Sequence, residues 1–96
     1  MKFKRNWICI QMIAKAKDKF EFRYGWTSED GQYGFHKSGK FWVATDIASG
    51  MKIIAFPTRI ECVEWIKNNS KLISIAKTTP RYLDAIELMR EFCNKN

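Results

Sequence analysis

The segment from Lys19 to Trp26 alternates strictly between aromatic rings and charged or small residues. The rings are Phe20, Phe22, Tyr24 and Trp26, and the residues between them are Glu21, Arg23 and Gly25. Successive side chains of a β-strand point to opposite sides, so this period of two predicts a strand with one apolar face. A second alternation runs from Ile8 through Ile10 and Met12 to Ala14. With a turn predicted at Lys15–Asp18, the two segments form a hairpin.

Further strands are predicted as far as Phe56. Polar or glycine-containing segments predict turns, namely Thr27–Gln32 with its turn at Asp30–Gly31, Ser38–Gly39, and Ile47–Gly50. The strands between and after these turns are Tyr33–His36, Phe41–Asp46 and Met51–Phe56. The last two of these strands are expected to pair as a second hairpin.

The second hairpin is apolar on both faces, because Trp42 lies next to Val43 and Ile53 next to Ile54. Two interpretations follow. These segments are either middle strands covered by helices, or they carry an aromatic binding face around Trp26 and Trp42.

Two helices are predicted after Phe56. The first begins at a capping box, Thr58–Glu61, and ends at Asn68–Asn69, a pair suited to a left-handed stop. Its apolar stripe is Ile60, Val63 and Ile66, flanked by Cys62 and Trp65. The second helix begins with Thr79 as its cap and Pro80 as its first residue. Its apolar face is Leu83, Ile86, Met89 and Cys93, widened by Tyr82, Ala85 and Phe92. Between the helices, Leu72–Ala76 is interpreted as an extra strand or an extended connection.

This order of elements predicts the α+β class: an antiparallel β-meander of four to five strands followed by two helices packed on the sheet. The chain has 96 residues and shows no repeat or linker, so residues 1–96 are expected to form a single domain.

The formal net charge is +7, and it is concentrated near the N-terminus, where Lys2, Lys4 and Arg5 begin a basic segment. Such a charge attracts polyanions. Lys2–Ala14 imitates a signal peptide, but Gln11 interrupts its short apolar stretch and the strand pattern continues. The cysteines Cys9, Cys62 and Cys93 are widely spaced, and we interpret them as small buried side chains in a reducing compartment. We therefore expect a cytoplasmic protein without membrane segments.

No motif points to catalysis. Gly34–Phe41 has the glycines and lysine of a phosphate-binding loop, but Phe41 replaces the Ser/Thr and a strand is predicted where a helix is needed. His36 is the only histidine and is expected in a loop or at a strand end, where it could touch phosphate. The carboxylates lie on polar helix faces. We predict a protein that is not an enzyme and has no catalytic residue, metal ligand or cofactor.

The remaining signal combines cations with aromatic rings near strands and turns, a combination that favours nucleic-acid binding. The candidate binding residues are Lys2, Lys4, Arg5, Arg23, Tyr24, Trp26, Tyr33, Lys37, Lys40, Trp42 and Lys52. The leading hypothesis is a small basic binding module that regulates by contacting nucleic acid or a nucleic-acid-handling complex. The alternative is a phage-type protein inhibitor or adaptor, such as an anti-defence protein, that acts by binding another protein. Self-association through Lys2–Ala14 or the Trp42 face is a third option for partners.

Overall fold

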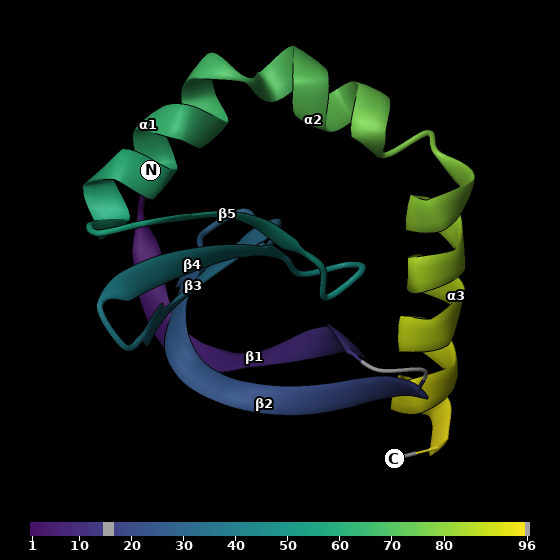
Figure 1. Ribbon diagram of the computed structural model, residues 1–96. Coiled ribbons are helices and arrows are strands. Elements are labelled where there is room, and N and C mark those ends of the chain that lie inside the picture. Colours follow the sequence, from purple (N-terminus) through teal and green to yellow (C-terminus); the bar gives the residue numbers. More distant parts are fainter. Residues whose placement is uncertain (15–16, 96) are drawn as a thin grey trace.

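The computed structural model describes residues 1–14 and 17–95 and contains five strands followed by three helices (Figure 1). The strands are β1 (Phe3–Ala14), β2 (Lys17–Ser28), β3 (Tyr33–Ser38), β4 (Phe41–Asp46) and β5 (Lys52–Phe56). The helices are α1 (Arg59–Asn68), α2 (Ser70–Ala76) and α3 (Pro80–Lys95). The strands form one antiparallel sheet in the order β1-β2-β3-β4-β5. The predicted α+β meander is confirmed, with one helix more than expected.

The first hairpin is longer than its alternation indicated. β1 begins at Phe3 instead of Ile8, and β2 continues to Ser28, so Thr27 and Ser28 are buried strand residues and not part of a polar loop. Ala14 pairs with Lys17, and the predicted turn residues Lys15 and Ala16 lie outside the described residues. Ile8 and Ile10 are buried as expected, whereas the side chains of Met12 and Ala14 lie outside those described.

The sheet is strongly curved, and the helices arch over one part of it. Figure 1 shows β1 and β2 as a long bent ribbon, α1 and α2 above β4 and β5, and α3 upright at the far end of the β1–β2 hairpin. A buried cluster joins the central strands to the first two helices: Phe35, Ala44, Cys62, Ile66 and Ile73. Burial of this apolar surface is the main term that holds the helices against the sheet.

The second hairpin has nearly its predicted bounds, but only part of it is covered. β5 is an edge strand of the sheet, so it is not the middle strand that one interpretation required. Ala44 is fully buried, whereas Phe41 at the start of β4 is half exposed. Trp42 is partly buried against the core cluster. The apolar pattern on both faces therefore reflects a mixture of core packing and exposed surface.

The first predicted helix starts where expected. The Glu61 amide donates to Thr58 Oγ1 at 3.2 Å, which confirms Thr58 as the N-cap, and the Glu61 carboxylate reaches back to accept from the Thr58 hydroxyl at 3.0 Å. The predicted stripe is displaced, because Ile60 is 72% exposed while Cys62 is buried. The predicted left-handed stop is wrong, since Asn69 has φ −124° and the chain continues directly into α2.

The prediction of an extended segment at Leu72–Ala76 is wrong, because these residues belong to α2. Helical hydrogen bonds run from the Ile73 amide to the Asn69 carbonyl at 3.0 Å and from the Lys77 amide to the Ile73 carbonyl at 3.1 Å. Only Ile73 of this helix is buried. A short apolar run with β-branched residues fits a strand or a short helix equally well, so the periodicity of Leu72–Ala76 could not distinguish the two.

α3 begins as predicted, with the Tyr82 amide donating to Thr79 Oγ1 at 3.3 Å. Its predicted apolar face is buried only in part: Ala85 and Met89 are buried as expected, whereas Leu83 and Cys93 are exposed. The buried face is set by contacts with the first hairpin, where the rings of Phe20 and Phe92 stack with centroids 4.3 Å apart. The exposed Cys93 contradicts the prediction of three buried thiols, although Cys62 is buried and Cys9 half-buried.

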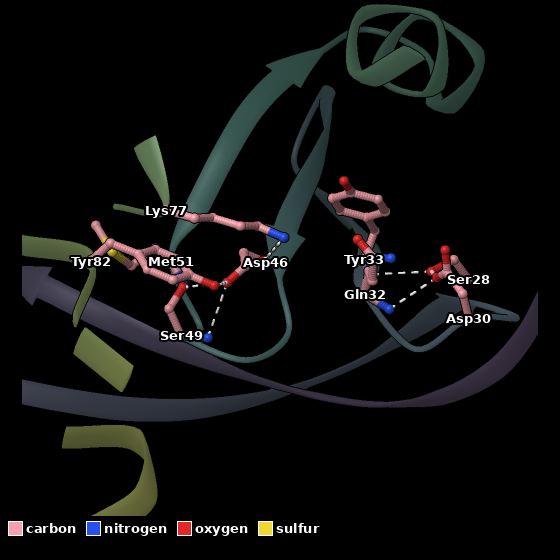
Figure 2. Close-up of polar contacts among 9 residues, drawn as sticks. All are labelled: Ser28, Asp30, Gln32, Tyr33, Asp46, Ser49, Met51, Lys77 and Tyr82. Atoms are coloured by element: carbon pink, nitrogen blue, oxygen red, sulfur yellow. Dashed lines mark hydrogen bonds and ion pairs between the residues drawn. The ribbon is translucent and has the colours of Figure 1, made fainter. Parts of the chain in front are cut away.

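A polar cluster around Asp46 ties α3 to the turn between β4 and β5 (Figure 2). Asp46 Oδ2 accepts hydrogen bonds from the Ser49 hydroxyl at 2.7 Å, the Ser49 amide at 3.1 Å and the Tyr82 hydroxyl at 2.8 Å. Lys77 Nζ lies 3.7 Å from the other carboxylate oxygen. Burial and the Asp46 hydrogen bond raise the pKa of Tyr82, so its phenol remains a donor.

Gln11 joins the same turn to β1. Its backbone amide donates to the Gly50 carbonyl at 2.8 Å, and its side chain donates to the carbonyls of Ser49 at 3.0 Å and Ala85 at 3.2 Å. Gln11, the polar residue in the apolar segment Ile8–Ala14, therefore connects β1 to both the β4–β5 turn and α3.

His36 lies within β3 and is buried, so the expected position in a loop or at a strand end is wrong. Its Nδ1 atom has no hydrogen-bond partner among the described residues. Burial, followed by the charge of Arg23, lowers the pKa of the imidazole below its ordinary value. His36 consequently binds a proton less readily in the folded chain than in the unfolded chain.

Lowering the pH from about 7.5 to 5.5 is therefore expected to destabilise the fold. The unfolded chain takes up a proton at His36 near its ordinary pKa of about 6.5, and the free energy of unfolding falls below that pH by up to about 1.4 kcal/mol per pH unit. Urea unfolding at several pH values measures the effect. A His36→Leu variant should show a flatter profile over this range. An equally steep profile in that variant would assign the pH dependence to other groups.

Candidate functional site

One face of the sheet carries a continuous row of arginine and aromatic side chains, which we call the arginine–aromatic stripe. Its members come from β1, β2, β4 and the start of α1: Phe3, Arg5, Trp7, Tyr24, Trp26, Trp42 and Arg59. Arg5 pairs with Trp26, and Trp7 pairs with Tyr24, across the β1–β2 ladder. Paired residues and residues two apart on a strand point to the same face, so the hairpin register alone brings four of these side chains together.

The two guanidinium groups lie over the rings and link them. Arg5 Cζ is 4.4 Å from the centroid of the Tyr24 ring and 4.7 Å from that of Trp26. Arg59 Cζ is 5.3 Å from the centroid of Trp26 and 5.7 Å from that of Trp42. Trp7 extends the stripe, with its ring centroid 5.1 Å from that of Tyr24. All of these distances fall within the range of favourable cation–π and ring–ring contacts.

The stripe is positively charged and is not neutralised by neighbouring acids. The next positions on the same face of these strands are Cys9, Phe22, Ser28 and Ala44, none of them acidic. Neither Arg5 nor Arg59 forms an ion pair with any residue that the structure describes. The edges of both guanidinium groups therefore keep their N–H donors for another partner.

The outer part of the stripe is exposed to an unusual degree for aromatic side chains. Trp7 is 62% exposed and Tyr24 50% exposed, and Phe22 beside them is 54% exposed. Trp26 and Trp42, nearer α1, are half-buried, so they are neither fully core nor fully surface. A contiguous exposed group of large rings is typical of a surface that another molecule covers.

The structure brings only some of the predicted site residues together. Arg5, Tyr24, Trp26 and Trp42 belong to the stripe, and Lys37 pairs with Trp42 on the same face. Lys40 lies in the adjoining β3–β4 turn. The four stripe residues are linked through the Arg5 and Arg59 contacts, whereas Lys37 and Lys40 adjoin Trp42 alone, by strand pairing and by sequence.

The other predicted residues lie elsewhere. Lys4 and Arg23 point to the opposite face, because each is one position away from a stripe residue, and Arg23 pairs with Glu21. Lys2 precedes β1 and its carbonyl accepts the Glu29 amide at 2.9 Å. Tyr33 lies near Lys77, and Lys52 lines a pocket beneath α2.

Phe3, Trp7 and Arg59 are the stripe residues that sequence reasoning missed. Trp7 was not predicted because it precedes Ile8, where the apolar alternation of the first strand begins. Any hairpin register in which odd-numbered residues of β1 pair with even-numbered residues of β2 nevertheless places Trp7 on the face of Tyr24. Arg59 is the first residue of α1 and reaches the sheet only through the tertiary packing of that helix. No local signal in the sequence marks it.

We also searched the described residues for a metal site and for a membrane-spanning helix. Within residues 1–14 and 17–95, no group of three His, Cys, Asp or Glu side chains gathers as metal ligands would. No helix in this part of the chain is long and apolar enough to cross a membrane. Burial raises the pKa of the Cys62 thiol, whose Sγ atom lies 3.4 Å from the Trp42 carbonyl oxygen.

Comparison of the chain with protein-family models, with curated proteins and with solved structures gave no match.

Proposed function

We propose that this protein is a small binding module that holds single-stranded nucleic acid along the arginine–aromatic stripe. One observation carries the proposal: two arginines without an ion pair among the described residues lie over a row of aromatic rings on one face of the sheet, and two rings of that row, Trp7 and Tyr24, are exposed. Guanidinium edges bind phosphate oxygens, while flat rings stack on unpaired bases. The stripe offers both kinds of contact within one continuous surface.

Each side chain of the stripe has a distinct role in this proposal. Trp7 and Tyr24 supply exposed ring faces for bases, at about 1–3 kcal/mol for each stacked base. Arg5 and Arg59 are held over the rings, so little side-chain freedom remains to be lost when they bind phosphate. Lys37 and Lys40 extend the positive charge along the path of the backbone.

The same geometry favours single strands over duplexes. Base pairs in a duplex hide the flat faces that aromatic side chains need, whereas unpaired bases expose them. Reading a major groove requires a helix that protrudes from the surface. The helix next to the stripe, α1, instead packs on the sheet, and its first residue, Arg59, lies over the stripe rings.

Charge reversal within the stripe is the direct test. We expect an Arg5→Glu substitution to weaken binding of a fluorescein-labelled oligonucleotide of about 16 nucleotides by about tenfold or more. The plot of log K against log salt has a negative slope, and it should become less steep by about 0.7 for each phosphate that the variant no longer neutralises. Fluorescence anisotropy between about 50 and 200 mM salt, with single-stranded DNA, RNA and a duplex as probes, measures both quantities.

Arg23→Glu is the matched control, because it changes the net charge equally on the opposite face of the same hairpin. We expect it to change affinity by less than about threefold. Equal losses for Arg5→Glu and Arg23→Glu would mean a diffuse electrostatic contact and would remove the stripe from the proposal. A flat anisotropy curve with every nucleic acid at low salt would overturn it.

A protein partner with an acidic surface is the second candidate. The observation that favours it is the exposed ring of Phe22, which extends the stripe toward Phe92 without adding a cation. Trp, Tyr and Arg are also the residues that dominate protein interfaces. A pull-down with nuclease-treated and untreated samples separates the two candidates. A partner that is retained after nuclease treatment and lost on Trp7→Ala substitution would favour this candidate.

A further inference from the structure

A pocket of about 320 Å³ lies between β5, α2 and the start of α3, and none of its lining residues belongs to the stripe. Its wall is mostly apolar, with contributions from Met51, Ile53, Trp65, Leu72 and Ala76. Leu72 is 56% exposed although it lines this hollow. The volume is at the small end of the range for ligand cavities, about 300–1,000 Å³.

The charged groups of the pocket are predominantly cationic, beside the neutral polar residues Ser49, Thr79 and Tyr82. Lys52, Lys77 and Arg81 line it, against one acid, Asp46. Asp46 is already occupied by Ser49, Tyr82 and Lys77, as Figure 2 shows. Lys52 and Arg81 form no ion pair with any described residue. An apolar wall with two unpaired cations is complementary to a molecule that has an apolar body and a negative end.

We infer that this pocket binds a small carboxylate with an aliphatic or aromatic body. The body packs against Trp65, Ile53 and Leu72 and covers apolar surface that is otherwise in water. The carboxylate lies toward Lys52 and Arg81, where charge-assisted hydrogen bonds fix its orientation. Ile73 is the only buried residue of α2. A bound ligand would add contacts between α2 and β5 and so stabilise the position of this helix. This inference is independent of the nucleic-acid proposal.

Ligands of equal chain length and different head-group charge provide the test. Sodium octanoate, octanol and octylammonium chloride are titrated into ¹⁵N-labelled protein, and amide shifts are followed by NMR. We expect saturable shifts at Met51, Ile53 and Leu72 with octanoate, and at least about tenfold weaker binding of octanol and octylammonium. Equal binding of the three ligands, shifts confined to the stripe, or no saturable shift with octanoate would each overturn the inference.

Two variants sharpen the result. Ala76→Phe fills the pocket and should abolish the octanoate shifts, while Lys52→Glu with Arg81→Glu should remove the preference for octanoate over octanol. The matched control is Lys67→Glu with Lys71→Glu, which changes the charge equally on exposed helix positions that do not line the pocket. Octanoate preference retained in the pocket double variant would contradict the assigned cations. If either variant fails to fold, the ligand comparison on the unaltered chain still decides.

Discussion

Replacing Gly25 by alanine is expected to lower the free energy of unfolding by about 3–5 kcal/mol. A Cβ at this position would overlap the backbone carbonyl oxygen of Phe35, and neither backbone can move away without separating β2 from β3. The two strands are joined through only two paired positions, Trp26 with Phe35 and Thr27 with Gly34. A domain of this size has a total stability of roughly 5–15 kcal/mol, so the loss is a large part of it. Urea unfolding followed by far-ultraviolet circular dichroism measures the loss.

Gly34→Ala provides the comparison that identifies the cause. A Cβ there would lie 3.0 Å from three carbon atoms of the buried Ile8 side chain, which, unlike the Phe35 carbonyl, is not part of the backbone and needs to shift by only a few tenths of an ångström. We expect a smaller loss of about 1–3 kcal/mol. Adding Ile8→Val should give a double variant that loses less than the sum of the single losses. A Gly25→Ala protein as stable as the unaltered chain would show that β2 and β3 tolerate a wider separation than the structure indicates.

Much of this architecture can be predicted from the sequence because the strands have strong periodic patterns. The rings from Phe20 to Trp26 determine which face of β2 is apolar, and that face depends only on parity. If the turn of the first hairpin were one residue earlier or later, the partner of Arg5 would change by two positions along β2. A change of two positions keeps the same face, so Arg5 would still lie on the side of Tyr24 and Trp26. The sheet face of the stripe was therefore predictable even though the register was not.

The parts that were not predictable depend on tertiary contacts. The sequence places Arg59 only at a helix start, and the packing of α1 on the sheet is what brings it over Trp26. α2 is short, and its residues Leu72–Ala76 fit a strand equally well by their pattern, whereas in the structure the Ile73 amide donates to the Asn69 carbonyl at the end of α1. Ile60 and Leu83 fit apolar stripes by spacing but are exposed, because each helix is rotated by contacts that lie far away in the sequence.

Asp46→Ala is expected to lower the free energy of unfolding by about 3 kcal/mol and to loosen α3. The carboxylate is buried and accepts from Ser49 and Tyr82, so its removal leaves their donors without an acceptor. The Tyr82 hydroxyl links α3 directly to the Asp46 carboxylate, beside the link through Gln11, and Tyr82→Phe alone should cost about 1 kcal/mol. In a double-mutant cycle the two losses should not add, because both remove the same hydrogen bond. Hydrogen exchange should rise more in α3 than in β3.

Asp30→Ala is the matched control, since Asp30 also accepts from a serine hydroxyl and a backbone amide. The Ser28 hydroxyl donates at 2.6 Å and the Gln32 amide at 3.0 Å, but this aspartate is exposed (Figure 2). Water can replace it as the acceptor, so we expect a loss below about 1 kcal/mol and no change in α3. Similar losses for the two aspartates would mean that burial adds nothing to the Asp46 network. Unchanged hydrogen exchange in α3 of the Asp46→Ala protein would mean that apolar contacts such as Phe20–Phe92 hold the helix alone.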